Sequence, residues 1–158
     1  MKRLLDLAIL MAAALLLLHI YLDLRSLSHG SPLDDCGQVR QVWQAIEGRP
    51  YAWGAQGPDS FDCSGAIYFV QRSIGAPVPR TTAARYWVVA DGDPVHWGHA
   101  GCGYWIWWTL HPGRPYGHMG MHSEQPVVWH AGNSTGVTSV GIRPGGYWDR
   151  HFEGSKRP

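Results

Sequence analysis

The sequence carries little net charge: 13 Lys and Arg residues stand against 12 Asp and Glu residues, which leaves a formal charge of +1 at pH 7. Binding to nucleic acid generally requires a strongly basic surface, so the charge suggests no nucleic-acid partner. The sequence also lacks a Gly-rich phosphate loop, an internal repeat and a low-complexity tract, which argues against nucleotide-binding and repeat proteins. Its 158 residues suffice for one domain with a substantial core, and not for two.

Cysteine is scarce too, at three residues, whereas nine tryptophans and twenty glycines indicate a compact, loop-rich domain with aromatic surfaces. Three cysteines are compatible with an exported protein. If Cys63 is a nucleophile, Cys36 and Cys102 remain as a possible disulfide in an oxidising compartment. The alternative is two unpaired, partly buried thiols, because a disulfide forms only where the fold brings the two Cβ atoms together.

The N-terminal segment differs in composition from the rest of the chain. Lys2 and Arg3 precede an apolar run over residues 4–24, and 21 helical residues would reach roughly 31 Å, enough to cross a bilayer core. Positive charge before the run predicts a cytoplasmic N-terminus and an exported remainder. We therefore expect one hydrophobic helix, either a signal anchor or a cleaved signal peptide, in residues 1–25. Residues 26–33 form a linker, and residues 34–158 form a single domain.

The domain is predicted to contain helices first and strands afterwards. Apolar residues at three- and four-residue spacing predict a first helix that Asp34 or Asp35 caps and that ends before residues 48–50. A second helix is expected from about Cys63 to Ser73, and a third from Thr81 or Thr82 to about residue 88. Aromatic and alternating patterns then predict strands over residues 104–110, 117–122, 126–131, 136–142 and 147–152. This order gives an α+β domain with an antiparallel sheet.

The stretch around Cys63 is the most informative for function. Asp62, Ser64 and Gly65 make a polar, tight turn, and the apolar residues of the second helix begin only at Ala66. A cysteine in the first helical turn faces unpaired backbone N–H groups and the positive end of the helix dipole. Both effects favour the thiolate, which predicts a nucleophile near neutral pH. The alternative, a buried core cysteine, fits the polar neighbours less well.

A cysteine nucleophile needs a histidine to stabilise its charge and to protonate the leaving amine, and a third polar group to orient that histidine. His118 and His122 lie four residues apart on one strand face, and His130 lies on the next strand. The pattern allows a Cys63–His118–His130 arrangement, in which His130 stays neutral and orients His118. For His122 we expect a structural or rim position.

Five short blocks carry a resemblance to a known family. Tyr51-Ala52-Trp53-Gly54 is followed by Phe61-Asp62-Cys63-Ser64-Gly65, by residues 79–84, and by two histidine segments at residues 117–121 and 129–132. In this order and spacing the blocks resemble the NlpC/P60 family of cysteine peptidases, from about residue 34 to residue 152. The resemblance implies a papain-like α+β fold, with N-terminal helices packed on an antiparallel sheet.

The resemblance also implies an activity. Enzymes of this family cut the peptide stems of bacterial peptidoglycan, and the bond expected here is the amide between D-glutamate and the diamino acid. The implied catalytic residues are Cys63, His118 and His130, and no cofactor is required. With the N-terminal segment, this predicts a bacterial inner-membrane protein whose catalytic domain lies in the periplasm, or a periplasmic protein if the segment is cleaved.

Other residues have predicted roles at the same site. By resemblance Tyr51 lies near the nucleophile, where the backbone N–H of Cys63 can also stabilise an oxyanion. Asp62 and Ser64 either fix a peptide amine or cap the helix. Trp53 is expected to pack under the helix. Arg80 either faces an acidic stem peptide or is a solvated cap, and the tryptophans at positions 105, 107 and 108 are expected in the core or sheet rather than on glycan.

One segment departs from the family pattern. Over residues 91–115 the usual turn and short apolar strand cannot be identified. This departure keeps two alternatives open: an amidase or acyltransferase of the same fold, or a non-catalytic wall-binding component of an envelope-spanning assembly. The segment contains His96, His99 and His111, but no second ligand cluster accompanies them, so we predict no metal site.

Overall fold

The structure is a computed structural model that describes residues 11, 15–20 and 36–158. Residues 15–20 are helical and exposed. Most of the predicted hydrophobic helix, the linker over residues 26–33 and the predicted caps Asp34 and Asp35 lie outside the described residues. Among the described residues, no helix has the length and apolar character needed to span a membrane.

Three helices precede the sheet, as the sequence predicts, and their local sequence explains where they begin. Helix α2 (Cys36–Ile46) buries Val39, Trp43 and Ile46 along one stripe. Helix α3 (Cys63–Ser73) begins after Asp62, whose side chain accepts a hydrogen bond from the backbone N–H of Gly65. Helix α4 (Ala83–Val89) begins in the same way, because Thr82 accepts from the N–H of Arg85.

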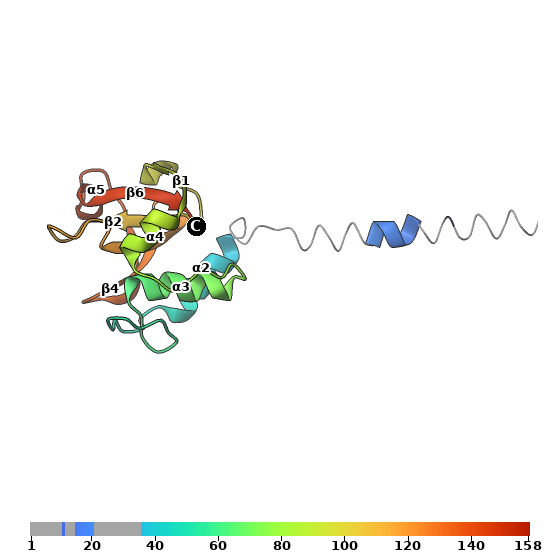
Figure 1. Ribbon diagram of the computed structural model, residues 1–158, viewed down its shortest axis with the longest axis horizontal. Helices are drawn as coiled ribbons and strands as arrows, with labels where there is room; N and C mark the ends of the chain where they lie inside the picture. The colour runs from blue at the N-terminus through green and yellow to red at the C-terminus, as the bar shows by residue number, and fades with distance from the viewer. Residues whose placement is uncertain (1–10, 12–14, 21–35) are drawn as a thin grey trace, which may run out of the picture. The chain divides into compact units, whose positions relative to one another are not determined.

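Six antiparallel strands form one sheet in the order β1-β6-β2-β3-β4-β5. Helices α2 and α3 lie on one face of this sheet (Figure 1). The C-terminal strand β6 lies between β1 and β2, so the sheet is not a simple meander. The strands are β1 (Asp91–Val95), β2 (Trp105–Trp108), β3 (His118–Glu124), β4 (Val127–Gly132), β5 (Gly136–Gly141) and β6 (Phe152–Arg157).

One sequence-based prediction about the sheet is wrong, and one of its strands was not predicted. Residues 147–152 are not a strand: Tyr147–Arg150 forms the short helix α5, and β6 begins at Phe152. The aromatic residues there favour a strand, but the Asp149 carboxylate accepts hydrogen bonds from the N–H of Gly145 and the indole of Trp97, which hold the turn. Strand β1 and the 3₁₀ turn η1 (Trp97–His99) were not predicted, because exposed Asp and Pro residues are unusual except in edge strands.

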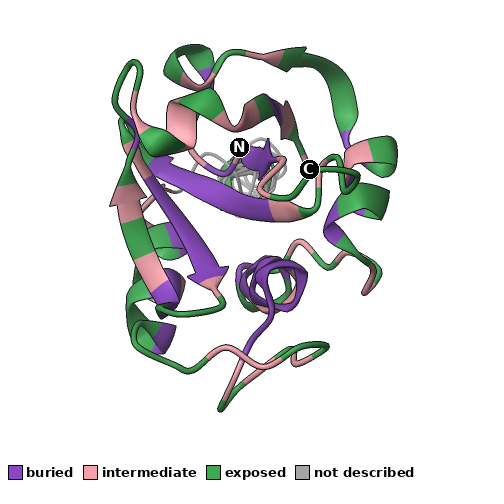
Figure 2. Cartoon of the chain, turned by 90° about the vertical axis from the view of Figure 1, so that its left-hand side faces the viewer, coloured by how far each residue is buried: buried purple, intermediate pink, exposed green. Residues whose placement is uncertain are grey.

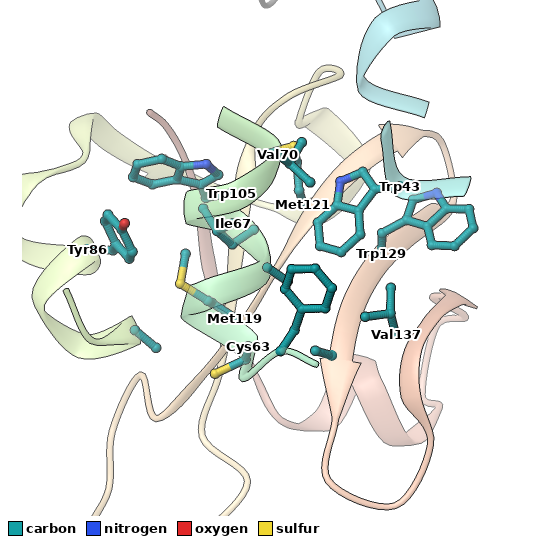
Figure 3. Packing of buried hydrophobic residues seen from close by; sticks show 14 of the residues in the cluster. Trp43, Cys63, Ile67, Val70, Tyr86, Trp105, Met119, Met121, Trp129 and Val137 are labelled. Atoms are coloured by element: carbon teal, nitrogen blue, oxygen red, sulfur yellow. The ribbon is translucent and has the colours of Figure 1, made fainter. Parts of the chain in front are cut away.

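Side chains alternate across the sheet and build a core on each face. The larger core joins the sheet to the helices, and Figure 3 shows Trp105, Met119, Met121 and Trp129 packed with residues of α2 and α3. The smaller core on the other side contains Ile106, Trp108, Val128 and Ile142. Buried residues accordingly concentrate in the central strands and in α3 (Figure 2).

A disulfide joins Cys36 at the start of α2 to Cys102 just before β2, with a Cα–Cα distance of 5.8 Å. It links positions 66 residues apart in the sequence. Of the two alternatives for these cysteines, the structure contains the disulfide. Among the described residues Cys63 is left as the free cysteine.

Candidate active site

The turn that carries Cys63 is held by Asp62. Its Oδ1 accepts from the Gly65 N–H at 2.6 Å and from the Ser64 hydroxyl at 2.9 Å. Its Oδ2 accepts from the Gly54 N–H at 2.9 Å and from the Arg80 guanidinium at 2.8 Å. A carboxylate offers about four lone-pair positions, and all are in use here. The capping interpretation of Asp62 is therefore favoured over direct binding of a substrate amine.

Arg80 has a role that neither sequence-based alternative anticipated. It forms an ion pair with Asp62, whose side chain is 9% exposed, and its own side chain is 25% exposed. It also donates to the Ser64 hydroxyl at 2.8 Å and to the backbone carbonyl of Thr81. Arg80 thus locks the helix start on which Cys63 sits. No periodicity or spacing in the sequence indicates this contact, because it joins residues 18 positions apart through loop geometry.

The Cys63 thiol is buried, with 8% of the residue exposed. Burial and, to a lesser extent, the Asp62 charge raise the pKa of this thiol from 9.0 to about 11, against the opposing effect of hydrogen bonds from the backbone of Met119, Ser64 and Cys63 itself. The predicted thiolate near neutral pH is therefore wrong for this resting structure. The backbone N–H groups act on the sulfur as expected, but desolvation of the charged form outweighs them.

His118 and His130 are in contact, as the strand pattern allows. His118 Nε2 lies 2.9 Å from His130 Nδ1. His118 is the first residue of β3, and His130 lies within β4. The backbone of Met119, the residue after His118, hydrogen-bonds the Cys63 sulfur. The start of β3 therefore meets the start of α3, and Figure 3 shows Cys63 beside Met119 at one end of the core.

Both imidazoles are neutral in this environment. Burial, together with the neighbouring His130 and His111, lowers the pKa of His118 from 6.5 to about 3. Burial likewise lowers the pKa of His130 to about 4. A neutral imidazole carries one N–H, so the contact can have the His118 Nε2–H donating to His130 Nδ1. That tautomer leaves Nδ1 of His118 free to accept a proton.

His122 lies elsewhere, as predicted for a structural histidine. It is 1% exposed, and its Nε2 lies 3.1 Å from the Ser155 hydroxyl on β6. Burial lowers its pKa to about 4. Among the described residues its Nδ1 has no hydrogen-bond partner. His122 therefore belongs to the packing of the sheet and not to the His118–His130 pair.

Tyr51 lies close to the thiol, whereas Trp53 does not pack as predicted. Burial raises the pKa of Tyr51, and the negative charges of ionised Cys63 and of Asp62 raise it further. Trp53 is 84% exposed, so its predicted position under the helix is wrong. The flanking Ala52 and Gly54 N–H groups bond to Phe61 and Asp62, which draws the backbone toward α3 and leaves the indole outside.

The three tryptophans of β2 are buried, at 1%, 0% and 0% exposure for Trp105, Trp107 and Trp108. This confirms that they belong to the core and the sheet. Sequence reasoning did not connect Trp108 with the histidines, although it pairs with His118 across the β2–β3 ladder. Strand alternation could have suggested this pairing if the register had been known. In the part of the chain that the structure describes, no three His, Cys, Asp or Glu side chains form a group suited to a metal ion.

Comparison with known proteins was made by sequence and by structure. Residues 48–157 match the sequence model of the NlpC/P60 family. The chain is 36% identical over 88 residues to a probable endopeptidase of Corynebacterium glutamicum, covering 56% of this chain and 39% of that protein. It is 33% identical over 119 residues to the probable peptidoglycan endopeptidase LytE of Bacillus subtilis, covering 72% of this chain and 32% of that protein. The chain thus spans less than two fifths of the length of these relatives.

Solved structures share the fold. A crystal structure of an NLP/P60 family protein similar to a lipoprotein, from Staphylococcus aureus, superposes with a TM-score of 0.63 at 27% sequence identity. The superposition covers 77% of this chain and 40% of that one. The shared part includes helices on an antiparallel sheet, which agrees with the α+β architecture predicted from the sequence.

Proposed function

Because this chain belongs to the NlpC/P60 family, we propose that it is a cysteine peptidase that hydrolyses amide bonds in the stem peptides of peptidoglycan. The observation that carries the proposal is the 2.9 Å contact between His118 and His130, beside a strand start that hydrogen-bonds the Cys63 sulfur. Relatives named as probable endopeptidases support the same class of reaction. In this proposal Cys63 is the nucleophile, His118 the base and His130 the group that orients His118.

The proposed reaction starts from a neutral thiol and a neutral imidazole. As the sulfur attacks the carbonyl carbon, His118 accepts the thiol proton, so the thiolate forms within the step and does not exist beforehand. The backbone N–H of Cys63 and the Tyr51 hydroxyl stabilise the resulting oxyanion. His118 then gives the proton to the leaving amine, and water, activated by His118, hydrolyses the thioester.

For the bond cleaved, we propose the amide between D-glutamate and the diamino acid. The Ser64 hydroxyl donates to Asp62 and accepts from Arg80, and the residue is buried, so Ser64 holds the turn that carries Cys63. Asp62 supports the same turn, since its lone pairs are occupied by protein donors. The choice of substrate follows from membership of the NlpC/P60 family and from a relative named as a probable peptidoglycan endopeptidase. Peptidoglycan stem peptides are therefore the proposed substrate.

A specific observation favours a second candidate, a wall-binding component without catalytic activity. The thiol is buried and its pKa is about 11, which is unfavourable for a nucleophile that must react near pH 7. In such a component the same cleft would hold a stem peptide without cutting it.

Digestion of purified sacculi by the full chain separates these functions. Mass analysis of released fragments should find new termini at D-glutamate and at the diamino acid, and Cys63→Ala should release none. Cleavage elsewhere, such as between the sugar and the peptide, would indicate an amidase. If neither protein releases fragments but both co-sediment equally with sacculi, the wall-binding function is correct and the peptidase is not.

We further propose that the domain acts in the periplasm, either tethered to the inner membrane through residues 4–24 or released by cleavage of that segment. The apolar run and the Cys36–Cys102 disulfide support export to an oxidising compartment. If the segment is retained, the eight-residue linker 26–33 limits the domain to about 28 Å from the membrane. Cell fractionation and the N-terminal sequence of the protein recovered from cells distinguish the two forms, and recovery in the cytoplasm would contradict both.

A further inference from the structure

Two indole rings enclose the His118–His130 pair. The Trp148 ring lies 4.8 Å from the His130 ring at an interplanar angle of 67°, and 6.2 Å from the His118 ring at 27°. The Trp108 ring lies 5.6 Å from His118 and 6.2 Å from His130. The two indoles are themselves 4.8 Å apart. The imidazole pair therefore has aromatic rings as its immediate neighbours.

Trp148 is held in this position by hydrogen bonds from outside its own helical turn. It lies on α5 (Tyr147–Arg150), a single turn that has no side-chain cap at its start. The turn is held by Asp149, which accepts from Trp97 Nε1 at 2.7 Å and from the Gly145 N–H at 2.8 Å. Trp97 belongs to η1. The Gln125 side chain donates hydrogen bonds to the backbone carbonyls of Trp97 and Ala100, and these bonds fix the position of η1.

The segment over residues 91–115, which departs from the family pattern, supplies two tryptophans that support this arrangement. Trp108, which lies directly against the histidines, and Trp97, which anchors Asp149, both fall within residues 91–115. The unusual sequence of this segment therefore contributes to the immediate surroundings of the imidazole pair.

We propose that Trp148 is a positioning residue for the proposed reaction: with Trp108 it shields the His118–His130 hydrogen bond from water and fixes the His118 ring. This inference rests on the proposed function. A hydrogen bond between two neutral imidazoles is readily exchanged for bonds to water, so its persistence depends on exclusion of solvent. Trp148 is only partly buried, and it forms the outer wall of this enclosure.

Two buried nitrogen atoms beside the His118–His130 hydrogen bond show why solvent exclusion matters. Among the described residues, His130 Nε2 and Trp108 Nε1 are buried without a hydrogen-bond partner. A positive charge on His130 would therefore be poorly stabilised, which keeps this ring neutral and able to accept from His118. Removing Trp148 would admit water to these atoms and allow either ring to be protonated.

Other ionisable groups near the pair remain in place when Trp148 is changed. His111, which follows β2, and Cys63, at the start of α3, lie on the His118 side. Asp149, Arg150 and His151 adjoin Trp148 on α5 and directly after it. Since none of these is removed in a Trp148 variant, a change in the titration of His118 and His130 reports on the enclosure itself.

The test uses the full chain with its disulfide intact and compares Trp148→Ala, Trp148→Phe and Asp149→Ala with Tyr147→Ala. Tyr147 lies on the same turn and is 51% exposed, so its removal is a matched control. Imidazole titration is followed by NMR, and hydrolysis of stem peptides gives kcat and KM. The titration needs no substrate, so it remains decisive even if wild-type protein proves not to be a hydrolase.

In wild type we expect both imidazoles to stay neutral down to about pH 4. Trp148→Ala should raise their midpoints by at least about one pH unit toward the ordinary value near 6.5, and kcat should fall roughly tenfold with little change in KM. Asp149→Ala should also raise the midpoints, but by less than Trp148→Ala, because loss of a nearby negative charge lowers imidazole pKa values and opposes the effect of opening the enclosure. Trp148→Phe and Tyr147→Ala should leave the midpoints near wild type.

Unshifted midpoints in a folded Trp148→Ala protein would overturn the inference and make Trp148 a packing residue. Equal shifts in Tyr147→Ala would do the same, because they would report general loosening of the turn. If Trp148→Ala does not fold, the comparison of Asp149→Ala with Tyr147→Ala decides in its place, and equal midpoints in these two variants would reject the proposal.

Discussion

At Cys63 two opposing effects act on the same sulfur atom. The first turn of α3 supplies backbone donors that favour the thiolate, while burial favours the neutral thiol and raises its pKa to about 11. The half-buried imidazole of His118 also resists protonation, because desolvation and its histidine neighbours lower its pKa to about 3. Proton transfer from thiol to imidazole is therefore unfavourable at rest. In the proposed reaction it becomes favourable only when an electrophilic carbonyl carbon receives the sulfur electrons.

The histidines should differ in importance. His118→Ala should reduce hydrolysis as severely as Cys63→Ala, because the two residues act as a unit in the proposed step. His130→Ala should cost less, and His130→Gln less again, since an amide oxygen can still accept from His118 Nε2. His122→Ala should leave the rate per folded molecule close to wild type.

Rates of fragment release from sacculi, normalised to folded protein by circular dichroism, check this series. Equal damage from His122→Ala and His118→Ala would show that the wrong histidine has been assigned as the base.

For individual residues, the sequence predicts which side chains contact one another better than it predicts their ionisation. The order and spacing of the blocks predict Cys63, His118 and His130 as one group, and of these contacts the structure shows the one between His118 and His130. His122 contacts Ser155 instead. The ionisation of Cys63 was mispredicted, because desolvation depends on side chains that arrive from β3 and are invisible in the local sequence. The Asp62–Arg80 ion pair was missed for the same reason.

Among the elements, the helices were predictable and the edges of the sheet were not. Helices α3 and α4 follow from caps and apolar spacing that lie within a few residues of one another. Helix α5 depends on the bond between Asp149 and Trp97, 52 positions apart, so its aromatic sequence misleadingly favoured a strand. Strand β1 exists because β6 pairs with it, and its own residues give little indication.

The disulfide between α2 and the start of β2 makes a prediction about stability. Closing a loop of 66 residues restricts the unfolded chain, which corresponds to about 4 kcal/mol in the loop-entropy description. Urea unfolding of a Cys36→Ser, Cys102→Ser double variant should give an unfolding free energy lower by about that amount. Reduced wild-type protein should match the variant, and an unchanged unfolding midpoint in both would show that the disulfide contributes nothing to stability.

For the whole molecule, two buried histidines, His122 and His130, and the half-buried His118 predict sensitivity to acid. Burial lowers the pKa values of His118, His122 and His130 to between about 3 and about 4, below the 6.5 expected in the unfolded chain. Below pH 6.5 the unfolded state therefore binds more protons than the folded state. Above about pH 6.5 these histidines are neutral in both states and do not lower the free energy of unfolding. As the pH falls from 6.5 toward 4, the free energy of unfolding decreases, by up to ~1.4 kcal/mol per pH unit for each histidine.

Denaturant unfolding at several pH values between 7.5 and 4.5 measures this slope. His122→Gln should make the slope shallower by about a third, because one of the three titrating groups is removed while Ser155 keeps a partner. A variant slope identical to wild type would mean that His122 is already accessible to protons in the folded state.

The place of β6 in the sheet also bears on when the molecule becomes active. Strand β2 borders β3, which carries His118, but the other side of β2 is completed only by residues 152–157. A growing or translocating chain thus exposes its cysteine and both histidines well before their supporting strand has emerged. Pairing between such distant parts of a chain forms late. If the proposed peptidase function is correct, we expect activity to appear only after residue 157 has been synthesised, because β2 lacks one of its two neighbouring strands until then.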